Sequence, residues 1–269
     1  MEDTLTFIGR DRKAREQLAS LWGIARFDFH DTVESTQNVA RTLAMERAPE
    51  WTIVVADRQT AGRGQHGRKW QAGDGSSLMF SLLLRPRGIE ETALMPIRIG
   101  LAIARAIDRF LAHGGGRPGK TMLKWPNDLV VGNGKVGGIL CEGQATGTAA
   151  WIIVGVGINI GRFPVHLPDR RFLQAAFLEE YLRPRTTRLD LLEAIIASLH
   201  ADLPTRMGEL DDAEMRDYFD RDWLYGHTLK SPVAGKAIGI TRNGHLRVLK
   251  PDGSEEPVIA GHIVLDDHQ

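Results

Sequence analysis

Residues 59–70 read Gln-Thr-Ala-Gly-Arg-Gly-Gln-His-Gly-Arg-Lys-Trp, and the way this segment continues decides which nucleotide-binding folds the chain can adopt. Its three glycines have the Gly-x-Gly-x-x-Gly spacing of a dinucleotide-binding fingerprint, but that fingerprint opens a helix. Here Arg-Lys-Trp follows the last glycine and leads into a second glycine-rich stretch at residues 73–75. The segment therefore predicts a loop and not the start of a dinucleotide-binding helix.

The same loop carries side chains that are typical of an anion site. Its glycines allow the backbone to fold tightly and to present several N–H groups to an anion. Arg63 and Arg68 can each hold a phosphate or carboxylate through two parallel hydrogen bonds, and Trp70 adds a flat apolar wall. A surface loop without a binding role has a similar composition, so the loop alone does not establish a site.

Strands and helices alternate on both sides of the loop. Apolar, β-branched runs predict strands over 51–57, 77–84 and 151–160, and a strand, a turn and a second strand over 121–142. Apolar residues three and four apart predict a long helix over 93–113, which the glycines at 114–116 would end. Other helices are predicted over 10–22, after Ser35-Thr36, over 188–203 with Thr187 as N-cap, and over 211–221.

From Leu224 onward the pattern changes to short strands and turns. Asn243-Gly244 and Asp252-Gly253 are strong hairpin signals between apolar runs. A unit of about 45 residues buries little surface alone, so we expect it to dock on the first domain. The sequence predicts an α/β (α+β) domain over 1–222 and a small all-β domain over 223–269.

The composition is that of an ordinary globular protein without a charge bias. Of 269 residues, 42% are apolar, and 34 basic residues balance 34 acidic ones. Nucleic-acid-binding domains usually show a basic excess, which is missing here. The single cysteine, Cys141, excludes an internal disulfide and a CxxC metal site. No signal-like start and no long apolar run is visible, so we expect a cytoplasmic protein with no membrane partner and no tightly held metal.

Three later segments combine charged or amide side chains with turns or strands. Residues 124–129 read Lys-Trp-Pro-Asn-Asp-Leu, and residues 135–142 place a lysine at the mouth of a strand. Asn159 interrupts the apolar strand at 151–160, and a buried amide needs partners, which a ligand can supply. Each segment also has a plain structural explanation: a polar turn, a solvated lysine on a hairpin, or an amide satisfied by protein groups.

The order and spacing of these segments closely resemble the signature blocks of biotin protein ligases. The resemblance covers residues 59–70, 124–129, 135–142 and 155–160, and Val33–Thr36 resembles the family's segment before its first helix. It implies a catalytic domain similar to class II aminoacyl-tRNA synthetases and an SH3-like C-terminal domain. It also implies that biotin reacts with MgATP to give biotinyl-5′-AMP, from which biotin passes to a lysine of a biotin carboxyl carrier protein.

The resemblance also implies the roles of individual residues. The residues expected to bind biotin are Ser35, Thr36, Gln59, Gly62, Arg63 and Gly138. Those expected around ATP are Gln65, Trp70, Asn127 and Asn159. Those expected to carry the chemistry are Arg68, Lys124, Asp128 and Lys135. Asp128 would orient and deprotonate the carrier lysine, and Lys135 would stabilise charge on the acyl carbonyl and on the departing AMP.

The sequence departs from the family pattern in two places. Many relatives have Gly-Arg-Gly-Arg in the glycine-rich loop, where this chain has Gln65 in place of the second arginine, and Gln37-Asn38 replaces the commoner asparagine after Ser-Thr. Some relatives carry an N-terminal DNA-binding winged helix. Only about 30 residues precede Ser35, enough for one helix, so we expect the short form without specific DNA binding.

Three questions stay open on the sequence alone. A lipoate or octanoate ligase or transferase has a related catalytic domain, and the segments at 62–70 and 124–129 speak against it. A non-catalytic sensor of biotin or its adenylate is the other alternative. Retention of Lys124, Asp128 and Lys135 favours an enzyme. The oligomeric state, including a homodimer, is not determined.

Overall fold

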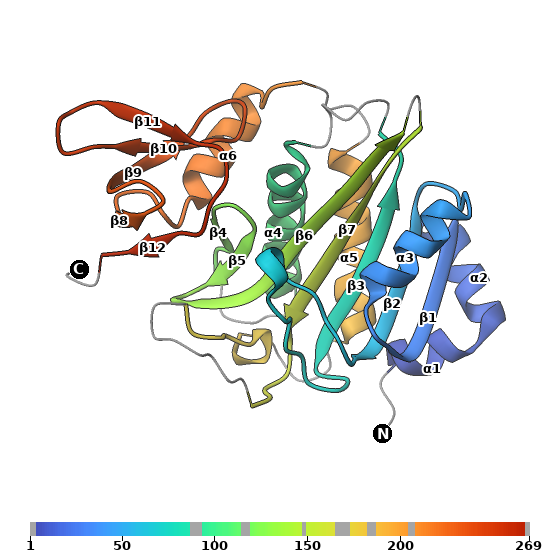
Figure 1. Ribbon diagram of the computed structural model, residues 1–269. Helices are drawn as coiled ribbons and strands as arrows, with labels where there is room; N and C mark the ends of the chain where they lie inside the picture. The colour runs from blue at the N-terminus through green and yellow to red at the C-terminus, as the bar shows by residue number, and fades with distance from the viewer. Residues whose placement is uncertain are drawn as a thin grey trace.

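The computed structural model describes residues 4–86, 93–113, 119–146, 149–164, 173–181, 187–203 and 208–266. Figure 1 shows a large twisted sheet that crosses the molecule and a smaller sheet at one side of it. The large sheet has the strand order β1-β2-β3-β7-β6-β5-β4, and the smaller sheet has the order β11-β10-β9-β8-β12. The chain therefore has a mixed α/β fold with two sheets, as the sequence predicts.

The large sheet is antiparallel except at one edge, where β1 and β2 pair in parallel. Its strands are β1 (Arg26–Val33), β2 (Thr52–Gln59), β3 (Ser77–Leu84), β4 (Met122–Lys124), β5 (Asp128–Val131), β6 (Gly134–Thr146) and β7 (Ala149–Asn159). The strands predicted over 51–57, 77–84 and 151–160 are confirmed. The strand, turn and strand predicted over 121–142 are confirmed around 132–134, except that a turn at 125–127 divides the first strand into β4 and β5.

Six α-helices lie within the described residues. They are α1 (Thr4–Arg10), α2 (Arg12–Leu21), α3 (Thr36–Met45), α4 (Met95–His113), α5 (Arg188–Asp202) and α6 (Asp212–Arg221), with short 3-10 turns η1 (Gln65–Gly67) and η3 (Leu178–Glu180). The Ser35 side chain caps α3, and Thr187 forms a capping box with Asp190 at the start of α5, so both predicted N-caps are confirmed. The glycines at 114–116 lie outside the described residues.

The helix predicted over 10–22 is confirmed as α2, but the expectation of only one helix before the first strand is wrong. Two helices precede β1, because the Asp11 side chain accepts hydrogen bonds from the backbone of Lys13 and Ala14 and starts a second helix. The first helix, α1, is held from inside the protein: Leu5 is fully buried, and Thr6 donates a hydrogen bond to Asp57 at 2.7 Å. The helix α1 therefore belongs to the body of the α/β half.

Opposite faces of the large sheet bury different helices. Along β3, Leu82 points to the main core with α4 and α5, whereas Leu83 packs in a smaller cluster with α3. The apolar stripe predicted on α4 is buried along its whole length, from Leu94 to Leu111. Because α3 covers only part of its face, the rest of that face is available for a cavity (Figure 1).

The smaller sheet is built from hairpins, as its sequence predicts. Its strands are β8 (Thr228–Ser231), β9 (Gly235–Ile240), β10 (Leu246–Leu249), β11 (Glu255–Val258) and β12 (Val264–Leu265). Gly244 and Gly253 take positive φ angles of 76° and 83° in the turns before and after β10. Glycine adopts this conformation without the steric cost that a Cβ would bring, which is why Asn-Gly and Asp-Gly mark these two turns.

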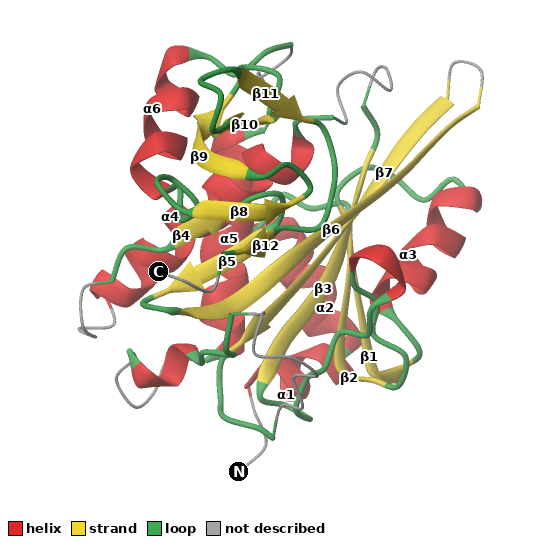
Figure 2. Cartoon of the chain, turned by 60° about the vertical axis from the view of Figure 1, so that its left-hand side comes forward, coloured by secondary structure: helices red, strands yellow, loops and turns green. Residues whose placement is uncertain are grey.

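The two sheets are fastened to each other beside β4 and β5 (Figure 2). The indole Nε1 of Trp125 donates a buried hydrogen bond to the Gly244 carbonyl at 2.9 Å, and Trp223 N donates to Leu123 O at 3.0 Å. A Cβ on Gly244 would lie 2.7 Å from side-chain carbons of Leu94 and Ile97 on the α4 side. The smaller sheet is therefore packed closely on the α/β half.

Asp222 lies at this junction, directly after α6, and is buried. Its Oδ1 accepts a hydrogen bond from Leu224 N at 2.9 Å, whereas its Oδ2 has no hydrogen-bond partner among the described residues. Burial raises the pKa of Asp222 to about 6, although hydrogen bonds from the Leu224 and Tyr225 backbone oppose the rise. Folding therefore makes the Asp222 carboxyl easier to protonate than it is in the unfolded chain.

We predict that Asp222→Asn flattens the pH dependence of stability. A pKa raised from 3.8 to about 6 corresponds to about 3 kcal/mol of folding stability, fully present below pH 3.8 and lost as the pH rises through 6. Asparagine keeps the acceptor for Leu224 N and carries no charge. Between pH 5 and pH 8, the free energy of unfolding measured in urea should fall more for wild type than for the variant. Equal falls in the two proteins would contradict the assignment.

Candidate active site

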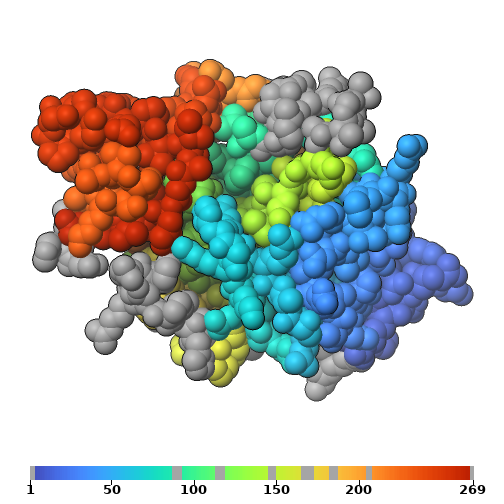
Figure 3. Space-filling model, viewed as in Figure 1, coloured from blue at the N-terminus to red at the C-terminus, as the bar shows by residue number. Residues whose placement is uncertain are grey.

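A cavity of about 440 Å³ lies on the face of the large sheet that α3 leaves uncovered. Every residue predicted for the site lines it except Gly62. In Figure 3 the loop after β2, coloured cyan, crosses this face between the smaller sheet in red and the α3 side in blue. We call residues 62–70 the lid loop. The fold therefore brings all of the predicted site residues except Gly62 to one cavity.

Glycines form the floor of the cavity. Gly155 and Gly157 on β7 and Gly138 on β6 all line it. A Cβ at Gly155 would lie 2.5 Å from the Gln37 side-chain oxygen, and a Cβ at Gly157 would overlap the indole ring of Trp70. These two glycines therefore let a helix side chain and the lid loop lie directly on the strands. This is the close approach that glycine in the strand predicts.

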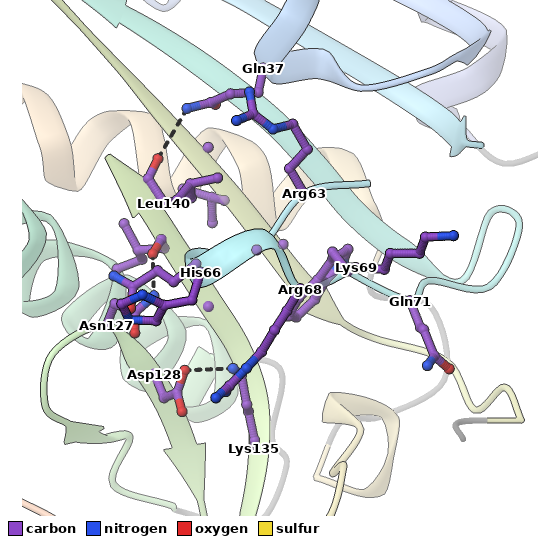
Figure 4. Close-up of a pocket in the computed structure, with 18 of the residues that line it drawn as sticks. Gln37, Arg63, His66, Arg68, Lys69, Gln71, Asn127, Asp128, Lys135 and Leu140 are labelled. Carbon is purple, nitrogen blue, oxygen red and sulfur yellow. Dashed lines mark hydrogen bonds and ion pairs between the residues drawn. The ribbon is translucent and has the colours of Figure 1, made fainter. Parts of the chain in front are cut away.

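The lid loop is folded as a small hairpin above the sheet (Figure 4). Gly64 N donates to Arg68 O at 2.8 Å, and Trp70 N donates to Gly62 O at 3.0 Å. His66 has a φ angle of 55° at the tip. A Cβ at Gly62 would lie 2.8 Å from the Trp70 carbonyl, so Gly62 closes the neck of the hairpin and does not line the cavity.

One end of the cavity presents neutral hydrogen-bonding groups. Thr36 N donates to the Gln59 side-chain oxygen at 2.8 Å, and the hydroxyls of Ser81 and Thr36 share a hydrogen bond of 2.9 Å. The buried Gln37 amide donates to Ile153 O and Leu140 O, and its oxygen accepts from Ser81. These side chains fix one another in a polar wall, which can recognise an uncharged polar group.

Arg63 extends toward the same end (Figure 4) and is held by a carboxylate. Its guanidinium makes two hydrogen bonds to Glu142, at 2.8 and 3.1 Å, and Arg41 on α3 contacts Glu142 at 2.8 Å. In the structure Arg63 thus points to a protein carboxylate. Its predicted role toward a ligand carboxylate stays a prediction, and it requires Arg63 to exchange partners.

The opposite end concentrates positive charge. Lys135 Nζ lies 2.5 Å from Asp128 Oδ1, and Lys124 Nζ lies 3.8 Å from Asp128 Oδ2. Arg68 extends from the lid loop toward this pair (Figure 4). Burial lowers the pKa of Lys124, and the charges of Lys135 and Arg68 lower it further, although Asp128 opposes them. A single carboxylate therefore faces three cationic side chains, an arrangement that favours a multiply charged anion.

Two buried polar atoms in the wall lack protein partners among the described residues. They are the indole nitrogen of Trp70 and the Oδ1 atom of Asn159. The Asn159 amide nitrogen makes only long contacts, of 3.4 and 3.5 Å, to carbonyls of Ala176 and Lys135. By contrast, the Asn127 amide donates to Ile139 O at 2.6 Å and stabilises the turn. Trp70 and Asn159 therefore offer a donor and an acceptor to a ligand.

Sequence reasoning missed part of the lining. Gly261, His262 and Ile263 come from the smaller sheet, far from the other lining residues in the sequence. No local pattern marks them, because only the docking of the two sheets brings them to the cavity. Gln37 was marked in the sequence only as a departure from the family pattern, which gave no role in the cavity. Ser81 lies in an apolar run that reads as a plain strand.

Other kinds of site find no support in the part of the chain that is described. No group of three or more His, Cys, Asp or Glu side chains is placed there to hold a metal ion. Burial raises the pKa of the Cys141 thiol to about 12, which disfavours a thiolate nucleophile. No described helix combines the length and the apolar character needed to cross a bilayer.

We predict that Gly157→Ala loosens the lid loop without unfolding the protein. The new methyl group would occupy the position of the Trp70 ring, so Trp70 and the loop must move. Trypsin cleavage after Arg63 and Arg68 should become several-fold faster than in wild type. Gly143→Ala, at an exposed position of β6, is the matched control and should be cleaved at the wild-type rate. Equal rates in all three proteins would contradict the seating of Trp70.

Comparisons with known proteins connect the chain to biotin protein ligases. The family model described as "Biotin/lipoate A/B protein ligase family" matches residues 29–159, which include every predicted site residue. The "Bifunctional ligase/repressor BirA" of Bacillus subtilis is 29% identical over 244 residues, or 84% of this chain and 70% of that protein. A "Biotin--[acetyl-CoA-carboxylase] ligase" of Mycobacterium tuberculosis is 31% identical over 144 residues, or 48% of this chain and 52% of that protein.

Solved structures extend the similarity to nearly the whole chain. A biotin protein ligase from Aquifex aeolicus in complex with biotin and ATP matches with a TM-score of 0.73 at 26% identity, covering 90% of this chain and 99% of that one. A biotin protein ligase from Leishmania major in complex with biotin matches with a TM-score of 0.61 at 27% identity, covering 88% and 99%. Residues 29–159 therefore form a domain of the biotin/lipoate A/B protein ligase family, in a chain whose fold is similar to solved biotin protein ligases.

Proposed function

We propose that this enzyme is an ATP-dependent biotin protein ligase. The observation that carries the proposal is the polarity of the cavity: neutral hydrogen-bonding groups at one end, around Thr36 and Gln59, and a cationic group at the other, around Asp128. Biotin has an uncharged ureido ring and an anionic tail, and ATP brings a polyphosphate. The similar Aquifex enzyme was solved with biotin and ATP. The neutral end therefore fits the ureido ring of biotin, and the cationic end fits the polyphosphate of ATP.

In the first step the biotin carboxylate attacks the α-phosphorus of ATP. A new C(=O)O–P bond forms, the bond to the β-phosphate oxygen breaks, and pyrophosphate leaves. Both reactants are anions, so catalysis consists mainly of positioning and charge neutralisation. Arg68, Lys124 and Lys135 supply positive charge, and Asp128 holds the lysine side chains in place. Arg63, once released from Glu142, would meet the biotin carboxylate.

Magnesium enters this reaction as part of the substrate. Mg²⁺ is bound mainly by phosphate oxygens and water in such complexes, and it neutralises charge on the leaving pyrophosphate. We assign Asn159 and Trp70 to the nucleotide, an assignment that their unpaired buried atoms support.

In the second step the ε-amine of a carrier lysine attacks the acyl carbon of biotinyl-AMP. An amide bond forms, the acyl–phosphate bond breaks, and AMP and a proton leave. A free lysine has a pKa of about 10.4, so the amine must lose its proton first. We assign Asp128 to orient this amine and to accept its proton, and Lys135 to stabilise negative charge on the acyl oxygen and on AMP.

The carrier partner follows from the relatives. The Mycobacterium protein is named for acetyl-CoA carboxylase, so we assign a biotin carboxyl carrier domain of a carboxylase as the acceptor.

We also assign residues 1–222 to a catalytic domain of the class II aminoacyl-tRNA synthetase type and 223–269 to an SH3-like domain. The Bacillus relative is also named a repressor. Absence of specific DNA binding stays a prediction for this chain.

The two rival functions are separated by one pair of measurements. A lipoate or octanoate ligase should gain thermal stability from lipoate or octanoate, whereas a biotin ligase should gain it from biotin. A non-catalytic sensor should bind biotin without turnover. We expect biotin alone to raise the Tm, and pyrophosphate to appear only when biotin and MgATP are both present. Stabilisation by lipoate and not by biotin would overturn the proposal.

We predict that Lys135→Ala lowers the rate of biotinyl-AMP formation about 100- to 1,000-fold, the usual cost of removing one preorganised charge donor. Lys135 is partly exposed and outside the core, so the fold should survive. Lys236→Ala removes an exposed lysine from β9 and serves as the matched control. A near wild-type rate in Lys135→Ala would show that Lys135 is only a solvated lysine.

We predict that Gln65→Arg slows the escape of biotinyl-AMP about fivefold. Gln65 lines the cavity and offers a neutral amide, whereas arginine would hold the single phosphate charge of the adenylate through two hydrogen bonds. The difference is about 1 kcal/mol for one contact. A chase experiment measures the off-rate, with Gln144→Arg at the exposed far end of β6 as control. Unchanged or faster release would assign retention to other residues.

A further inference from the structure

The smaller sheet contributes a histidine to the cavity. His262 lies between β11 and β12, and it lines the cavity together with its neighbours Gly261 and Ile263. Ile263 is buried in the main core, and Val264 pairs with Ser231 on β8, so the segment is fixed on both sides of the imidazole. The side of the sheet that carries β8 and β12 lies beside β4 and β5 (Figures 1 and 2). His262 is therefore held at the cationic end of the cavity.

The groups that face His262 are mostly cationic. Arg68 and His66 face it from the lid loop, and Lys124 and Asp128 from the β4–β5 hairpin. Burial holds the pKa of His262 below its ordinary value, and Arg68, Lys124 and His66 lower it further, while Asp128 alone opposes them. Asp128 carries one negative charge and pairs with two lysines, so this group stays net positive and favours an anion.

We infer that His262 is a phosphate-contacting residue that takes up a proton when the polyphosphate of ATP binds. This inference rests on the proposed function and names a residue that the resemblance did not assign. The proton comes from the solvent and adds to the neutral ring nitrogen, giving an imidazolium that donates to a phosphate oxygen. An anion within about 4–6 Å favours the charged form of such a group. Release of pyrophosphate would return the proton.

The arrangement has a physical advantage over a permanent cation. A fourth fixed positive charge beside Arg68, Lys124 and Lys135 would repel its neighbours whenever no anion is present. A histidine avoids this repulsion, because it becomes charged only when phosphate arrives. The same exchange ties the smaller sheet to the reaction, since binding energy gained at His262 is available only while the two sheets stay docked through Trp125.

The first test follows the imidazole directly. The Cε1–H resonance of His262, assigned by its loss in His262→Asn, is titrated against pH with and without saturating inorganic pyrophosphate. We expect the titration midpoint to rise by about one pH unit or more on binding. His245, near the start of β10 and outside the cavity lining, is the internal control and should not move. An unchanged midpoint in protein that binds pyrophosphate overturns the inference.

The second test separates this role from a purely structural one. In His262→Asn the KM for MgATP should be several-fold higher than in wild type at pH 6.5, and the two values should converge at pH 8.5. The KM for biotin should be unchanged, and His245→Asn should match wild type throughout. A KM difference that is constant with pH would also contradict proton uptake. If no biotin-dependent pyrophosphate release occurs at all, the proposed function fails instead, while the pyrophosphate titration still reports on His262.

Discussion

The seating of Trp70 on Gly157 is the contact on which the rest of the site depends. A sheet normally carries side chains on both faces, and a cavity can lie against it only where those side chains are absent. On β7 the sequence alternates between large apolar residues and glycine, so one face packs in the core and the other is free for a cavity. Val156 and Ile158 point into the main core, while Gly155 and Gly157 leave the other face bare. The lid loop can then close over the strands and bring its arginines to the cavity.

Charge sets the second constraint, because the cavity brings cationic groups from three parts of the chain around a single carboxylate. Asp128 pairs closely with Lys135 and at longer range with Lys124, so one negative charge is shared between two lysines. Such a cluster is unfavourable until an anion binds, so its cost in the free protein becomes affinity for a polyphosphate. The polar wall around Thr36 and Gln59 has no such excess of positive charge, so the two ends of the cavity favour different chemical groups.

The sequence predicted the features that depend on local patterns. Periodicity located α4 and α5, the capping residues Ser35 and Thr187 marked helix starts, and Asn243-Gly244 marked a hairpin. The motif segments also predicted most of the cavity lining, because each motif lies at the end of a strand or in the loop between two strands.

Features that depend on tertiary contacts escaped the sequence. The helix α1 is short and is stabilised by the burial of Leu5 and by the hydrogen bond from Thr6 to Asp57, neither of which has a local signature. His262 reaches the cavity only through the docking of the two sheets. The partner of Arg63 could not be foreseen either, since Glu142 lies 79 residues away in the sequence and meets it only across β6 and the lid loop.

The central claim is that this cavity joins biotin to a protein lysine at the expense of ATP. Intact-mass measurement of a biotin carboxyl carrier domain, incubated with the enzyme, biotin and MgATP, tests it most directly. The account predicts that the carrier gains the mass of one biotinyl group, that the gain requires MgATP, and that it is lost when the acceptor lysine is replaced. A carrier that stays unmodified while an equivalent lipoyl acceptor domain is modified with lipoate would contradict the account.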